Sequence, residues 1–141
     1  MYRVTVRAEF SAAHRLRSAD GEYEPLHDHD WTVEASFVGA DLDATGMLVD
    51  FEEVRPALQS VTQRLDHSSL NEAPLLAGLN PSAENVARVI CEALAGAIAR
   101  PDLLESVRVT EAPGCTAAYY RAASPRCSSD GRSVDDTRGG L

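Results

Sequence analysis

The chain has 141 residues, of which 44% are hydrophobic and 25% charged, and this composition suits one globular domain with a single core. Its net charge is −9 at pH 7, which argues against nonspecific binding to nucleic acid or to anionic membranes. No apolar run approaches the roughly 20 residues of a membrane span, and the N-terminus lacks the apolar stretch of a secretory signal. We therefore expect a cytoplasmic protein without a membrane segment.

Residues 2–10 alternate strictly between apolar and polar side chains, which predicts a half-buried β-strand. If the alternation continues without a bulge, His14 lies on the apolar face of this strand. A buried imidazole needs partners for its ring nitrogens. The sequence leaves two partners possible for the His14 imidazole, a backbone carbonyl or a metal ion.

A second strand is predicted over residues 31–37, and its backward extension places His27 and His29 in phase with Trp31. Side chains two apart on a strand share one face, so both strands bring their histidines to a shared turn. Three imidazoles can hold a metal ion and leave its fourth position open, as in catalytic zinc sites. A His-x-His pair is a weak signal alone, and ordinary hydrogen-bonded histidines are the alternative.

Two helices are predicted in the middle of the chain. An apolar stripe over residues 51–65 indicates the first, although Pro56 is unfavourable in a helix interior, so the helix either begins near Arg55 or is kinked. In the second, Asn80 supplies the cap, Pro81 takes the first helical position, and the helical stripe continues to about residue 99.

Asp66 and His67 directly follow the first helix. A histidine there can be a plain contact with the helix C-terminus. It can equally be a general base or acid that the neighbouring aspartate orients. The sequence leaves both interpretations open.

Two short strands are predicted at 107–110 and 117–122, and a turn that begins at Glu111 joins them. Residues 123–141 are polar, and we expect a disordered tail after a single domain over 1–122. The order predicts an α+β fold in which two helices pack on one face of a four-stranded antiparallel sheet. Open sheet edges invite pairing between chains, so a homo-oligomer is expected.

Six motifs stand out along the chain, and all four histidines fall within them. The motifs are Phe10-Ser-Ala-Ala-His14, Leu26-His27-Asp28-His29, Gly46-Met47-Leu48-Val49-Asp50-Phe51, Leu65-Asp66-His67 with Leu70-Asn71, Asn80-Pro81-Ser82-Ala83-Glu84-Asn85, and Val109-Thr110-Glu111. In this order they resemble the 6-pyruvoyl-tetrahydropterin synthase and 6-carboxytetrahydropterin synthase (QueD-like) family. The resemblance implies the ββααββ T-fold, or tunnelling fold, which assembles into trimers and hexamers.

The resemblance also implies a zinc-dependent carbon–oxygen or carbon–carbon lyase that converts the side chain of 7,8-dihydroneopterin triphosphate. The product would feed a pterin or queuosine-type pathway. Arg15, Arg17 and Arg88 are candidate cations for the triphosphate. The implied roles are zinc binding by His14, His27 and His29, a catalytic relay of Asp66 and His67, and a pterin anchor at Glu111.

The sequence departs from the family where a cysteine usually precedes the His-x-His pair, because residues 20–26 contain none. Glu22 or Glu24 could act as the base instead, as glutamate does in relatives that release 6-hydroxymethyl-dihydropterin. Cys115 could also be brought near from the last hairpin. A non-catalytic pterin-binding module and a structural zinc protein are the remaining alternatives.

Overall fold

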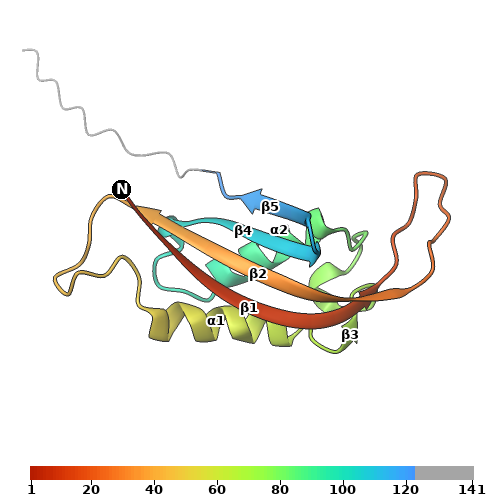
Figure 1. Cartoon of the computed structure of the whole chain (residues 1–141), viewed down its shortest axis with the longest axis horizontal. Helices are drawn as coiled ribbons and strands as arrows, with labels where there is room; N and C mark the ends of the chain where they lie inside the picture. The colour runs from red at the N-terminus through yellow and green to blue at the C-terminus, as the bar shows by residue number, and fades with distance from the viewer. Residues whose placement is uncertain (123–141) are drawn as a thin grey trace, which may run out of the picture.

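The computed structural model describes residues 1–122, so the expected disordered tail at 123–141 lies outside the described residues. A long hairpin dominates the structure: β1 (Tyr2–His14) pairs antiparallel with β2 (His27–Gly39) along its full length. The segment 15–26 joins them and projects beyond the end of the sheet, at the right of Figure 1. No helix within residues 1–122 is long and apolar enough to cross a bilayer.

The remaining elements complete a five-stranded sheet in the order β3-β1-β2-β4-β5. The α+β class and the ββααββ order are confirmed, and the sheet gains one strand, because β3 pairs parallel with β1 and makes the sheet mixed. These elements are α1 (Phe51–Gln63), β3 (Ser68–Ser69), η1 (Pro74–Leu76), α2 (Ala83–Ala95), η2 (Pro101–Leu103), β4 (Leu104–Ala112) and β5 (Cys115–Tyr120).

The core lies between one face of the sheet and the two helices. In β1 the alternate residues from Val6 to His14 are buried, whereas Arg3, Thr5 and Arg7 on the other face are exposed. Helix α1 contacts β1, and α2 contacts β4 and β5, so both helices cover the buried face (Figure 1). This burial supplies most of the driving force for folding and fixes the side of the hairpin on which His14 lies.

One helix begins where the sequence predicts and the other does not. Helix α1 starts at Phe51, where the apolar stripe begins, and Asp50 caps it by accepting a hydrogen bond from the Glu52 backbone at 2.9 Å. Of the two alternatives for Pro56, the start near Arg55 is wrong, because Pro56 lies within the helix on its exposed side. Helix α2 is capped by Ser82, whose hydroxyl accepts a hydrogen bond from the backbone of Asn85 at 3.2 Å. A side-chain oxygen at this position satisfies a free N–H of the first turn, so the cap does not fall on Asn80.

Cys91 and Cys115 should differ sharply in reactivity. Cys91 is fully buried in α2, and burial raises the pKa of its thiol to about 11, whereas Cys115 is exposed. Because the thiolate is the reactive form, iodoacetamide at pH 8 is expected to label Cys115 in the native protein and Cys91 only after unfolding. Peptide mass mapping of labelled protein checks this, and rapid native labelling of Cys91 would contradict the described packing of α2.

Candidate metal centre and active site

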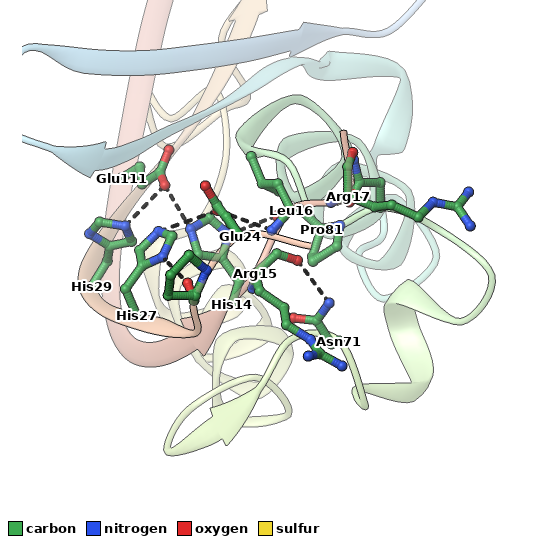
Figure 2. Close-up of polar contacts among 12 residues, drawn as sticks. His14, Arg15, Leu16, Arg17, Glu24, His27, His29, Asn71, Pro81 and Glu111 are labelled. Carbon is green, nitrogen blue, oxygen red and sulfur yellow. Dashed lines mark hydrogen bonds and ion pairs between the residues drawn. The ribbon is translucent and has the colours of Figure 1, made fainter. Parts of the chain in front are cut away.

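Three imidazoles and one carboxylate meet at the end of the β1–β2 hairpin (Figure 2). The imidazole centroids are 4.6, 4.7 and 5.1 Å apart, and the ring planes cross steeply instead of stacking. Side chains this close can share one ion. The ligand atoms of all four groups lie within 4.8 Å of one another, and the groups are His14, His27, His29 and Glu111.

The strand register produces this gathering. His14 lies opposite His27 at the last pair of the hairpin, and His29 lies opposite Ala12. All three histidines therefore follow the parity of the buried residues, as the sequence pattern predicts. Trp31, which is fully buried, packs beneath His14 and His29 with centroid distances of 5.1 and 5.9 Å. The rigid indole below limits how the two imidazoles can turn.

Backbone carbonyls orient two of the rings. Nδ1 of His14 lies 2.9 Å from the carbonyl oxygen of Pro81, and Nδ1 of His27 lies 3.0 Å from that of Pro25. A carbonyl only accepts, so each Nδ1 must carry the proton. In the neutral ring Nε2 is then unprotonated, which is the form and the second contact that metal-bound histidines have in proteins.

The free nitrogens fit a cation. Nε2 of His14 and Nε2 of His29 are buried and have no hydrogen-bond partner, although Glu111 Oε1 lies 2.7 and 3.0 Å from them. For His14, whose Nδ1 faces the Pro81 carbonyl, an unprotonated Nε2 and the Glu111 carboxylate oxygen repel each other unless a positive charge lies between them. Each unsatisfied buried group costs about 1–3 kcal/mol. Imidazole and carboxylate donors together suit a divalent ion such as zinc.

Glu111 reaches the imidazoles because β4 is longer than the sequence analysis predicted. The strand continues through Glu111 to Ala112, so the expectation of a turn beginning at Glu111 is wrong. Val107 and Val109 face the core, and Glu111 follows their parity toward the imidazoles. Continuing that alternation by one step was the signal that could have placed this carboxylate beside the histidines.

The two glutamates proposed as bases occupy different positions. Glu24 Oε1 lies 3.7 Å from Nε2 of His27 and accepts a hydrogen bond from the backbone of Leu16 at 3.0 Å. Glu22 is exposed, and its described hydrogen bonds involve its backbone, which contacts Ser18 and Asp20. Only Glu24 is therefore close to the cluster.

Asp66 and His67 lie apart from the imidazole cluster of their own chain. The backbone N–H of His67 donates to the Ser11 carbonyl at 2.7 Å, and Asp66 Oδ1 accepts from the Ser11 backbone at 2.9 Å. Ser11 has the opposite parity to His14 along β1. The side chain of His67 is 84% exposed, its Nε2 lies 3.4 Å from Asp66 Oδ2, and its backbone is left-handed with φ of 54°.

Cys115 lies close to the cluster, because it lines the same cavity as Glu111. It is exposed at the start of β5, and with Glu111 it lines a cavity of about 280 Å³. No polar contact joins its thiol to the imidazoles within residues 1–122. Cys115 therefore borders the site without belonging to the group of possible metal ligands.

Comparison with known proteins identifies the family. Residues 3–122 match the 6-pyruvoyl tetrahydropterin synthase family. The chain is 31% identical over 130 residues to the 6-pyruvoyl tetrahydrobiopterin synthase of Drosophila melanogaster, covering 82% of this chain and 77% of the relative. It is 33% identical over 90 residues to the dihydroneopterin monophosphate aldolase of Pyrococcus furiosus, covering 64% of this chain and 72% of the relative.

Solved structures share the fold. The 6-pyruvoyl tetrahydropterin synthase of Caenorhabditis elegans superposes with a TM-score of 0.74 at 24% identity, covering 86% of this chain and 98% of that one. At this identity the likeness establishes the T-fold. The family match over residues 3–122 and the identity to the Drosophila protein establish the family as well as the fold. This chain belongs to the 6-pyruvoyl tetrahydropterin synthase family.

Proposed function

We propose that this protein is a zinc-dependent lyase that acts on the side chain of a phosphorylated 7,8-dihydroneopterin. The observation that carries the proposal is the group of three imidazoles whose buried nitrogens at His14 and His29 lack partners. A divalent ion bound there would act as a Lewis acid and make substrate hydroxyl groups more acidic. The family membership supplies the substrate class.

Glu111 is proposed to hold the pterin ring. Its carboxylate can accept two hydrogen bonds from the adjacent N–H donors of an amino-pyrimidinone edge. It is partly exposed and borders a cavity of about 280 Å³, so a ring can approach it. Glu24 is proposed as the base, because its carboxylate lies 3.7 Å from His27 and residues 20–26 offer no thiol.

The two roles open to Glu111 can be separated by Glu111→Gln. If Glu111 anchors the substrate, the glutamine variant should keep its zinc. Its KM should rise at least about tenfold, because a charged hydrogen bond contributes roughly 1.5–3 kcal/mol. Zinc content by mass spectrometry and steady-state kinetics check this. Loss of zinc from the variant would instead make Glu111 a fourth ligand and close the site.

Asp66 and His67 are proposed to act on the site of a second copy in a homo-oligomer. Within one chain both residues bond to the backbone of Ser11, and neither belongs to the group of possible metal ligands found within residues 1–122. Mixing inactive His27→Ala with inactive His67→Ala protein under subunit exchange is expected to restore part of the activity. A mixture that remains as inactive as its components would show that the pair does not act between chains.

Two observations together favour an alternative product, 6-hydroxymethyl-dihydropterin. Glu24 occupies the neighbourhood of His27, and the Pyrococcus furiosus relative is named an aldolase. Cleavage of the carbon–carbon bond would release 6-hydroxymethyl-dihydropterin, whereas the synthase reactions yield 6-pyruvoyl-tetrahydropterin or 6-carboxytetrahydropterin. These products differ in mass.

The test is to incubate zinc-loaded protein with 7,8-dihydroneopterin triphosphate and, separately, with the monophosphate. Mass spectrometry of the products is expected to show one of the three pterins and to lose it after chelation. If the zinc-loaded oligomer consumes neither substrate, the proposal of an enzyme is wrong, and the alternative of a non-catalytic pterin-binding module stands.

A further inference from the structure

A second and larger cavity lies beside the imidazole cluster. Its volume is about 640 Å³, within the range of small-molecule sites. It is separate from the cavity that Glu111 borders. The residues around it include Arg15, Arg17, Tyr23, Asn71, Asn80 and Pro81.

Two asparagines fix the backbone from which the arginines extend. Asn71 accepts from the backbone N–H of Arg15 and donates to its carbonyl, both at 2.9 Å. Asn80 makes the same pair of bonds to Arg17, at 2.9 and 3.0 Å. Each amide thus replaces a strand partner for the segment that follows β1. Because the arginines are two residues apart in this extended segment, their side chains can serve the same cavity.

The cavity is a local basic site on an acidic protein. Arg15 lies over the ring of Tyr23, with 4.4 Å to the ring centroid, and this contact restrains its side chain. Neither Arg15 nor Arg17 forms an ion pair with a carboxylate within residues 1–122. Among the described residues Glu72 is the one acidic residue that lines the cavity, so two guanidinium charges face one carboxylate there, although the net charge of the chain is −9.

The position of the cavity relates it to the proposed active site. Arg15 follows His14 directly, and the carbonyl of Pro81, a residue that lines the cavity, is the one that orients His14. Figure 2 shows the arginine side chains extending away from the imidazoles, on a different side from Glu111. The proposed pterin anchor Glu111, the imidazole cluster and the basic cavity therefore lie in this order across the site.

We propose that this cavity binds the phosphate chain of the substrate through Arg15 and Arg17. The inference rests on the proposed function, because it takes the ligand to be a phosphate ester whose ring lies toward Glu111. Guanidinium groups donate paired hydrogen bonds to phosphate oxygens, and two such groups on one cavity can contact successive phosphates. Arg88, on α2, does not line this cavity.

Binding of inorganic anions tests the site without any turnover. Metal-free full-length protein is titrated calorimetrically with inorganic triphosphate, pyrophosphate and phosphate. The affinity is expected to fall in that order and to drop about 10- to 100-fold in Arg15→Gln and in Arg17→Gln, the size of effect for a charged hydrogen bond. Arg55→Gln, which removes an exposed charge on α1, is the matched control and should bind as wild type does.

Kinetics separate this inference from the proposed function. If both hold, KM for dihydroneopterin triphosphate rises in Arg15→Gln/Arg17→Gln while KM for unphosphorylated dihydroneopterin is unchanged. If wild type turns over neither substrate but its triphosphate binding depends on the arginines, the proposed function fails and the anion site stands. Wild-type triphosphate affinity in the double variant, or equal weakening in Arg55→Gln, would overturn the inference. Circular dichroism confirms that each variant is folded.

Discussion

Replacing His27 by alanine is expected to remove zinc from the protein and with it all measurable turnover. His27 is the most exposed of the three imidazoles, with 38% of its side chain accessible, so its loss should disturb the core least. Zinc affinity should fall by more than about 100-fold, because changes to the outer partners of metal ligands already cost about 10- to 100-fold. Competition with a chromophoric chelator measures the affinity directly.

His67→Ala is the matched control, because it also removes an imidazole but from outside the cluster. It should bind zinc as wild type does. Zinc retained by His27→Ala, or lost equally from His67→Ala, would contradict the assignment. The alternative of a structural zinc protein is tested by the same variants. It requires His27→Ala to unfold, whereas we expect its far-ultraviolet circular dichroism to match that of wild type.

Glu24→Gln is expected to lower kcat by about 10²–10⁴, the range for loss of a general base. Its carboxylate lies 3.7 Å from Nε2 of His27 and is held by the Leu16 backbone, so it is placed to take a proton from a substrate at the cluster. The glutamine keeps the shape and can still accept the Leu16 hydrogen bond. Zinc content should therefore stay constant while turnover falls.

Two matched variants complete this experiment. Glu22→Gln removes a neighbouring exposed carboxylate with no described contact to the cluster and should leave kcat within about twofold. Cys115→Ala removes the thiol that borders the Glu111 cavity and should also be neutral. Full activity in Glu24→Gln would exclude it as the base, and inactivity of Cys115→Ala would assign the role to the thiol.

The alternation of side chains allowed much of the site to be predicted. His14 follows the parity of the buried residues in β1, and His27 and His29 follow that of Trp31, so the hairpin register brings them together. Such inference is secure because a one-residue slip would expose the whole apolar face. The long hairpin, the two helices and the last hairpin followed from the same periodicities, whereas the two-residue strand β3 did not.

Contacts between distant segments could not be predicted in this way. The carbonyl of Pro81 orients His14 from 67 residues away, and Pro81 was expected inside a helix. Asn71 and Asn80 hold the Arg15–Arg17 segment from 56 and 63 residues away. No local pattern encodes such pairs, since they depend on how the loops after α1 and before α2 pack against the end of β1.

The zinc K-edge X-ray absorption spectrum of the purified full-length protein tests the metal centre most directly. The imidazole cluster requires one zinc per chain with three imidazole nitrogens at about 2.0–2.1 Å, and light-atom donors in the remaining coordination. Sulfur scattering at about 2.3 Å, or fewer than three imidazoles around the ion, would contradict a site built from His14, His27 and His29.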